Sequence, residues 1–409
     1  MPAENQSNKF QTIIIGGGAS GLVAAIVAAR RKQTVLIIEK NSAIGKKILV
    51  TGNGRCNLTN INVSPDKYYG ENTKCLHNIF NRFSYNDTIE FFEKLGVKLK
   101  TEPGGRVFPA SNQASTVLEA LERELFRLKV TIKLGERVTK LNSTKLGWQV
   151  NTDKNRYQSK SVILANGGKS YPQLGTTGDG YDFARQLGHQ IIEPKPALVP
   201  LQLEGSWFKD LPGIQVNVEL ILKQENKHIK RTGDLLFTHF GISGPVVLDI
   251  SRLIRKNDTG LFINFFPAYK NSKELESFLN INWQSHLRKT ILNSLAELLP
   301  KKLCAVLLNI LKINPDKQVG QINQKGRKLI TEHFIHWQVS VKSTRSFAEA
   351  MVSTGGVALD EINPKTMESL KAKGLYFAGE ILNIDGVSGG YNLQFAWSTG
   401  GLAGINCST

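Results

Sequence analysis

The chain has 409 residues, of which 41% are hydrophobic and 21% charged, a balance typical of a globular protein with two or three domains. The four cysteines (Cys56, Cys75, Cys304 and Cys407) are too scattered for a disulfide framework or a metal site, which excludes a small secreted scaffold and favours a cytoplasmic protein. The net charge of +18 would suit nucleic acid or an anionic membrane, but no long basic run occurs, so we expect no specific nucleic-acid partner.

Residues 12–29, "TIIIGGGASGLVAAIVAA", form the first informative stretch, and they contain no charged residue. A membrane-spanning helix needs about 20 apolar residues and seldom begins with three glycines. A signal peptide has an uninterrupted apolar core that ends at a cleavage site. Because glycines interrupt this stretch, we expect neither a signal peptide nor a membrane span.

The same residues are typical of a strand, a turn and a helix. Thr12–Ile15 is a β-branched run and predicts a buried strand, and Leu22–Ala29 predicts a helix of small and apolar residues. A second β-branched run, Thr34–Ile38, predicts the next strand. This order of elements is that of a dinucleotide-binding unit.

The glycines and one acid complete that pattern. We expect Gly16 to allow the tight turn, Gly18 to let the backbone approach a pyrophosphate, and Gly21 to let the helix pack closely on the strand. Glu39 ends the second strand and can accept hydrogen bonds from ribose hydroxyls. An acid at this position favours FAD or NAD over NADP.

Residues 45–60, "GKKILVTGNGRCNLTN", distinguish FAD from NAD. A simple dehydrogenase would continue with further strand and helix units, whereas this segment is rich in glycine and asparagine and carries Lys46, Lys47 and Arg55. We interpret it as a loop that lies along the pyrophosphate and the flavin.

Residues 135–152 then predict a β-hairpin, and Ser161–Ala165 predicts a third strand that ends in Asn166-Gly167-Gly168 near the cofactor. The C-terminal residues supply the second half of the site. Leu375–Ala378 predicts a strand followed by Gly379-Glu380, and Gly389-Gly390 opens a helix of small residues. We expect this helix start to face the N1 and O2 edge of the flavin and Glu380 to bind the ribityl chain.

An insert separates the two halves of the cofactor domain. Three prolines in residues 193–201 mark its start, short alternating runs predict a β-rich subdomain over 193–270, and helical spacing predicts a helical subdomain over 271–345. Residues 1–192 and 346–409 then form the cofactor domain. The helical range has twelve Lys or Arg against five Asp or Glu, so any anionic partner would bind there.

The sequence resembles, nearly end to end, the FAD-dependent oxidoreductase family that includes aminoacetone-oxidase-like and BaiN-like flavoproteins. The resemblance rests on "IIIGGGASGL", the 45–60 segment, "GGRVFPASNQAS" (104–115), "GGKSYPQLGTTGDGY" (167–181), "LLFTHFGISGPVVLDISR" (235–252) and "GGVALDEINPKTMESLKAKGLYFAGE" (355–380). It implies an α/β fold, with a Rossmann-like FAD-binding domain of the glutathione-reductase and fumarate-reductase type interrupted by the insert. Asn166 departs from the family, which usually has Thr there.

From the motifs and the resemblance together we expect non-covalent FAD and no metal. The expected FAD contacts are Gly16, Gly18, Ala19, Ser20, Gly21, Glu39, Lys40, Lys46, Thr51, Gly52, Asn57, Val138, Ala165, Gly167, Gly379, Glu380, Gly389, Gly390, Asn392 and Leu393.

The flavin would exchange a hydride at N5 with a small organic substrate bound between the FAD domain and the insert. We expect Arg106, Tyr171 and His239 to contact the substrate, and Tyr391 and His239 to be catalytic. His239 would act as a general base, or it would hold its glycine-rich loop by hydrogen bonds. Cys56 lacks a nearby second cysteine, so a dithiol mechanism is not expected.

Two chemistries and one other class of function remain open. Amine oxidation by oxygen would resemble the aminoacetone-oxidase members, and reduction by NAD(P)H would resemble the BaiN-like members. Because no second glycine-rich nucleotide unit occurs, NAD(P)H would enter the substrate cleft. The alternative is a flavin-containing nucleic-acid-binding or RNA-modifying protein, suggested by the +18 charge. The sequence does not indicate an oligomeric state.

Overall fold

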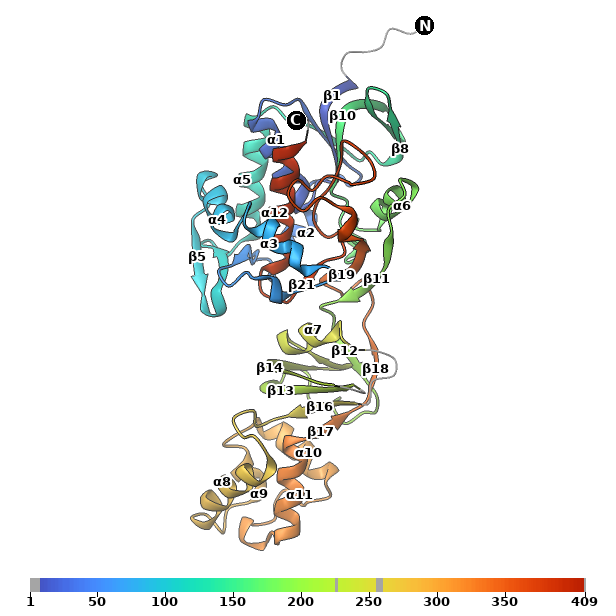
Figure 1. The fold of residues 1–409 in the computed structure, drawn as a ribbon. Helices are drawn as coiled ribbons and strands as arrows, with labels where there is room; N and C mark the ends of the chain where they lie inside the picture. Colours follow the sequence, from blue (N-terminus) through green and yellow to red (C-terminus); the bar gives the residue numbers. More distant parts are fainter. Residues whose placement is uncertain (1–7, 225–226, 255–259, 408–409) are drawn as a thin grey trace. The chain divides into compact units, whose positions relative to one another are not determined.

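The computed structural model describes residues 8–224, 227–254 and 260–407. The chain divides into two compact units, residues 1–196 with 350–409, and residues 197–349 (Figure 1). The sequence predicted an insert that begins at residue 193 and ends at residue 345, so each predicted boundary lies four residues before the boundary in the structure. Among the described residues, no helix is both long and apolar enough to span a bilayer.

A mostly parallel sheet organises the first unit, which we call the FAD unit after the cofactor that its motifs predict. Its strand order is β7-β2-β1-β10-β9-β8, and β20 also pairs with β10. The apolar runs at Ile13–Ile15 and Leu36–Ile38 are buried, as expected of central strands covered on both faces. The strands are β1 (Lys9–Ile15), β2 (Val35–Glu39), β7 (Thr131–Leu134), β8 (Val138–Thr144), β9 (Gly147–Thr152), β10 (Arg156–Leu164) and β20 (Leu375–Phe377).

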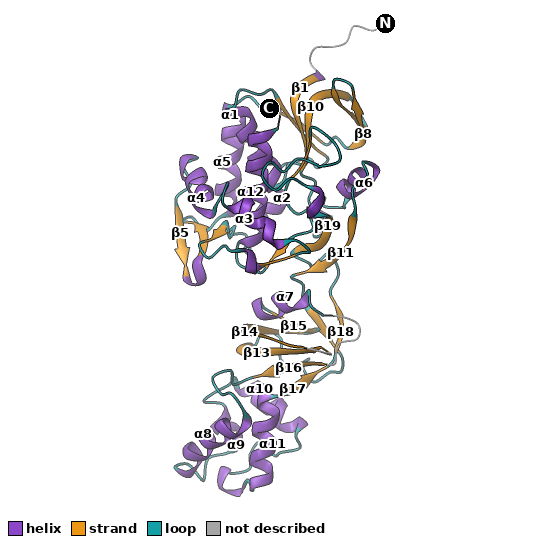
Figure 2. Ribbon diagram, in the orientation of Figure 1, coloured by secondary structure: helices purple, strands orange, loops and turns teal. Residues whose placement is uncertain are grey.

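Helix α1 (Ala19–Arg30) follows β1 and packs against α12 (Tyr391–Asn406), the last helix of the chain (Figure 2). A side chain at Gly400 would place its Cβ 2.3 Å from the Ser20 carbonyl oxygen, so the two helix backbones approach closely there. The Ser20 hydroxyl also donates to the Ala378 carbonyl at 3.1 Å, which ties α1 to the end of β20. The first and last parts of the chain therefore build one core.

The other elements of the FAD unit are short. The 45–60 segment was predicted as a loop, but it contains helix α2 at residues 46–50, which follows a left-handed Gly45, and strand β3 at residues 59–60. These elements are α2 (Lys46–Val50), β3 (Thr59–Asn60), β4 (Tyr68–Tyr69), α3 (Leu76–Phe80), α4 (Tyr85–Lys94), β5 (Leu99–Glu102), β6 (Arg106–Pro109), α5 (Ala114–Arg127), α6 (Asp179–Gln186), β11 (Ile191–Ala197), β19 (Val352–Val357) and β21 (Asp385–Gly386).

The insert consists of a sheet and a group of helices (Figure 2). The two share one hydrophobic core. The sheet order is β17-β16-β13-β14-β15-β12-β18, and its two end strands follow one another along the chain, so the sheet curls. The strands are β12 (Leu201–Leu203), β13 (Gln215–Gln224), β14 (Lys227–Thr238), β15 (Gly241–Ser243), β16 (Gly260–Asn264), β17 (Trp337–Val339) and β18 (Val341–Thr344).

The helices of the insert are α7 (Pro245–Ser251), α8 (Ser272–Gln284), α9 (Ile291–Leu295), α10 (Lys301–Ile310) and α11 (Gln324–Ile335). The range predicted as helical, 271–345, thus also contains β17 and β18. These two strands have three and four residues, too few for periodicity to distinguish them from helix ends.

Candidate cofactor cleft and active site

A cleft in the FAD unit opens at the carboxyl ends of β1, β2 and β10, and its empty space, including the open mouth, is about 1320 Å³. The predicted contacts that line it are Gly16, Gly18, Ala19, Ser20, Glu39, Lys40, Lys46, Thr51, Val138, Ala165, Gly167, Glu380, Asn392 and Leu393. The predicted contacts that do not line it are Gly21, Gly52, Asn57, Gly379, Gly389 and Gly390.

The glycine turn forms one wall of this cleft. Gly16 has a φ of +109°, and α1 begins three residues later without a side-chain cap. A Cβ on Gly18 would meet no atom within 4 Å, whereas one on Gly21 would lie 2.0 Å from the Gly16 carbonyl oxygen. Gly21 therefore serves the packing of helix on turn, and the first turn of α1 offers unpaired N–H groups to an anion in the cleft.

Glu39 is held in place at the end of β2. Its Oε2 accepts a hydrogen bond from the Gly17 N–H at 2.8 Å, and its Oε1 accepts one from the Asn41 N–H at 2.8 Å. The residue is 8% exposed and lines the cleft. Each carboxylate oxygen has a further acceptor site, so a ribose diol can bind without displacing the backbone donors.

Glu39→Ala should weaken FAD binding by about 1–3 kcal/mol, because ribose hydroxyls and two backbone N–H groups would lose their acceptor. Titration of apoprotein with FAD, followed by flavin fluorescence, measures the change. Glu39→Gln keeps one acceptor oxygen and should lose less affinity. Equal affinity of the alanine variant and the wild type would remove Glu39 from the site.

Next to Glu39, Asp179 at the start of α6 accepts a hydrogen bond from Lys40 Nζ at 3.0 Å. Burial acts to raise the pKa of the Asp179 carboxyl, but the Thr177 hydroxyl and the Lys40 and Arg137 cations more than offset it and keep that pKa below its ordinary value. This end of the cleft is therefore charged and hydrogen-bonded.

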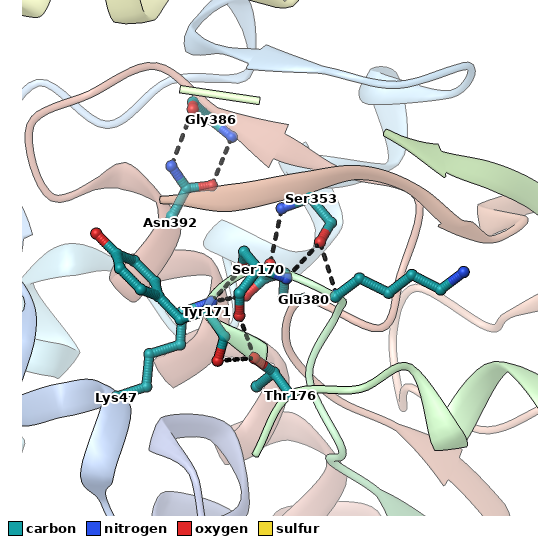
Figure 3. A network of polar contacts seen from close by, with 9 residues as sticks. Lys47, Ser170, Tyr171, Thr176, Ser353, Glu380, Gly386 and Asn392 are labelled. Atoms are coloured by element: carbon teal, nitrogen blue, oxygen red, sulfur yellow. Dashed lines mark hydrogen bonds and ion pairs between the residues drawn. The ribbon is translucent and has the colours of Figure 1, made fainter. Parts of the chain in front are cut away.

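A second polar network joins four segments that are distant in sequence (Figure 3). The Glu380 carboxylate accepts from Lys47 Nζ at 2.5 Å, from the Ser170 hydroxyl at 2.5 Å and from the Ser353 N–H at 2.7 Å. Lys47 Nζ also donates to the Ser170 hydroxyl at 2.5 Å. The Thr176 hydroxyl donates to the Ser170 carbonyl and to the Tyr171 carbonyl, which fixes the loop after β10.

Two buried amide oxygens bear on whether the residues of this cleft can hold FAD. Asn166 Oδ1 and Asn57 Oδ1 are buried and have no hydrogen-bond partner among the described residues. Asn166 lines the cleft, so its oxygen is an acceptor for a ligand. Together with the anion-binding turn and the diol-binding carboxylate, this donor and acceptor set fits an FAD molecule.

The two glycines before α12 pack closely against another segment of the FAD unit. A Cβ on Gly390 would lie 2.5 Å from the Thr59 carbonyl oxygen, and Asn60 Nδ2 donates to the Gly389 carbonyl at 3.0 Å. The Asn392 side chain pairs with both backbone groups of Gly386, at 2.8 and 2.9 Å (Figure 3). The close neighbour that requires Gly390 is therefore the 57–60 segment.

The predicted substrate and catalytic residues lie in different places. Arg106 is exposed on β6 and its Nε donates to the Pro103 carbonyl, while Tyr391 is 6% exposed and packs on the Tyr68 ring. His239 is exposed in the insert, where its ring contacts Phe240. Within the FAD unit, Tyr171 neighbours the Glu380 network, with its ring centroid 6.0 Å from Lys47 Nζ.

Cys56 is fully buried, and burial raises the pKa of its thiol to about 12, outweighing a hydrogen bond with Thr51 that lowers it. It is therefore a packed residue and not a nucleophile. The predictions missed Lys47, Ser170, Thr176 and Ser353 as site residues. Lys47, Ser170 and Thr176 lie inside motifs quoted above, and Ser353 stands two residues before another, but the hydrogen bonds of the network join different motifs.

The family model described as HI0933-like protein Rossmann domain matches residues 10–406. The chain belongs to the HI0933-like family. This HI0933-like protein is 39% identical over 380 residues to 3-dehydro-bile acid delta(4,6)-reductase of Clostridium scindens, covering 90% of this chain and 91% of the relative. It is 33% identical over 392 residues to ribosomal RNA dihydrouridine synthase of Escherichia coli, covering 96% of each chain.

A solved structure shares the fold of the HI0933-like protein: 3-ketosteroid-delta4-(5alpha)-dehydrogenase from Rhodococcus jostii RHA1 in complex with 4-androstene-3,17-dione. The TM-score is 0.52 at 14% identity, over 100% of this chain and 98% of that one. The comparisons confirm the predicted family and the predicted Rossmann-type FAD-binding fold. They also confirm the predicted activity class, and the protein is an FAD-dependent oxidoreductase.

Proposed function

We propose that this HI0933-like flavoprotein reduces a carbon–carbon double bond conjugated to a carbonyl group. One observation carries the proposal: two curated relatives with unlike substrates are named for reductions of this kind. A delta(4,6)-reductase of 3-dehydro-bile acids saturates double bonds conjugated to a 3-oxo group. Dihydrouridine differs from uridine by saturation of a ring double bond that is conjugated to a carbonyl.

FAD, when bound in the cleft and reduced, supplies the hydride for this chemistry. The first turn of α1 would hold the pyrophosphate, Glu39 would hold the ribose, and the Glu380 network would fix the loop after β10 beside the reacting end. NAD(P)H is the proposed reductant, and it would enter the same cleft because the chain has one glycine-rich nucleotide unit.

Anaerobic flavin bleaching tests the proposal. NADH or NADPH should bleach the flavin, and a conjugated acceptor should restore its colour without oxygen. The acceptors to compare are 4-androstene-3,17-dione and ribosomal RNA. The RNA is taken from a strain in which the gene for this protein has been deleted, so that its uridines have not already been reduced by it. Bleaching by amines but not by NAD(P)H would contradict the proposal and favour an amine oxidase.

A uridine within RNA is the second candidate acceptor, and charge favours it. Residues 271–345 carry seven more basic than acidic residues. Seven exposed lysines in the described part of this range form no ion pair there, namely Lys273, Lys301, Lys302, Lys312, Lys317, Lys325 and Lys342. If the ribosomal RNA restores the flavin colour and the steroid does not, RNA is the substrate. The binding of RNA to the protein should then weaken steeply as the salt concentration rises.

A further inference from the structure

The ammonium group of Lys47 has one donor that the protein does not use. An ammonium carries three N–H donors. Two are engaged by Glu380 and Ser170, both at 2.5 Å (Figure 3). No other described residue accepts a hydrogen bond from Lys47 Nζ. The Lys47 side chain is 22% exposed and lines the FAD cleft. The third donor is therefore available to a ligand in the cleft.

The proposed reaction needs such a donor. When a hydride adds to the β-carbon of a conjugated carbonyl compound, the double-bond electron pair moves to the α-carbon and the carbonyl oxygen. A proton must then reach the α-carbon. An acid that is already oriented accelerates this transfer.

Most of the other charged side chains that line the cleft lie away from Lys47. Lys40 and Arg137 form ion pairs with Asp179, and the Glu136 N–H donates to the Glu39 carbonyl, so these residues make one group at the end of β2. Lys47 belongs to the network that joins α2, the loop after β10, β19 and the residues after β20. Its orientation is fixed by two partners that are themselves buried or mostly buried.

We propose that Lys47 is the proton donor of the reduction, with Glu380 and Ser170 as positioning residues; this rests on the proposed function. The β-carbon gains a C–H bond from the hydride of reduced FAD. The α-carbon gains a C–H bond as one N–H bond of Lys47 breaks and the former double-bond pair takes the proton. The Lys47 amine then takes a proton from water, and NAD(P)H restores the reduced FAD.

Lys47→Met tests the proposal, because methionine is similar in length and has no proton to give. Stopped-flow absorbance under anaerobic conditions separates the two half-reactions. Flavin reduction by NAD(P)H should stay within about threefold of wild type. Flavin reoxidation by the acceptor that the wild type uses should slow by about 100-fold. Lys195→Met removes an exposed charge of the same unit and should change neither rate.

Deuterium oxide gives a readout that a purely structural role would not change. Wild-type product should carry one deuterium at the α-carbon on a single face. The residual product of Lys47→Met should carry it on both faces, because water then delivers the proton. For a uridine acceptor the α-carbon is C5 of the base.

Lys47→Arg separates proton donation from charge, because a guanidinium stays protonated in proteins. We expect this variant to retain FAD and still to reoxidise slowly. Reoxidation of FAD-loaded Lys47→Met at the wild-type rate would overturn the proposal, as would loss of FAD from that variant. Failure of the wild type to use any conjugated acceptor would instead overturn the proposed function.

Discussion

Gly390→Ala should destabilise the FAD unit by about 3 kcal/mol or more and abolish the retention of FAD. Gly390 has a φ of +101°, which is strained for any residue with a side chain. The added Cβ would also lie 2.5 Å from the Thr59 carbonyl oxygen and 2.9 Å from Asn57 Oδ1. Because Thr59 contributes backbone in β3, the clash cannot be relieved by a rotamer change.

Gly96→Ala is the matched control. Gly96 has a φ of +85°, but a Cβ there would meet no atom within 4 Å. This variant should lose about 1–2 kcal/mol from backbone strain alone. The insert has its own core, so its unfolding transition should not move in either variant. Equal losses at Gly390 and Gly96, measured by urea unfolding, would show that the contact with Thr59 is unimportant.

Glu380→Ala should cost about 3 kcal/mol of folding stability, within the range for removal of one partner from a buried ion pair. The Glu380 and Lys47 side chains are 18% and 22% exposed. Without the carboxylate, the Lys47 ammonium, the Ser170 hydroxyl and the Ser353 N–H would lose an acceptor. Thermal and urea unfolding of the apoprotein measure the loss, so that FAD binding does not enter the result.

Glu380→Gln provides the control for shape. The amide keeps one acceptor oxygen and nearly the same volume, so this variant should lose distinctly less stability than the alanine variant. If the two variants were equally stable, the charge of Glu380, and not its hydrogen bonds, would dominate. An alanine variant as stable as wild type would show that the network contributes nothing to folding.

The first strand, helix and second strand could be predicted from the sequence because their signals are local. The predicted strand Thr12–Ile15 lies within β1, and the predicted helix Leu22–Ala29 lies within α1. Gly21 is another local signal. Its spacing from Gly16 predicted close packing of helix on strand, and a Cβ added at Gly21 would meet the Gly16 carbonyl.

The Glu380 network could not be predicted in this way. Lys47, Ser170 and Ser353 are separated by more than 100 residues along the chain, and no periodicity links them to Glu380. Gly390 illustrates the same limit, because its glycine-rich motif predicted a helix start but not the contact with Thr59. Tyr391 stands beside that motif and is nevertheless buried, since burial depends on what packs there.

The pairing of α1 with α12 sets an order of events on the ribosome. All of the insert has been synthesised before Tyr391–Asn406 leaves the exit tunnel, and domains generally fold as they emerge. Until then α1 lacks its packing partner α12, in which Gly400 lies against Ser20. Asn392, Leu393, Phe395 and Ala396 are among the residues that line the cleft, so FAD capture has to wait until α12 has left the exit tunnel. A nascent chain stalled before residue 390 would carry a folded insert and no finished place for its cofactor.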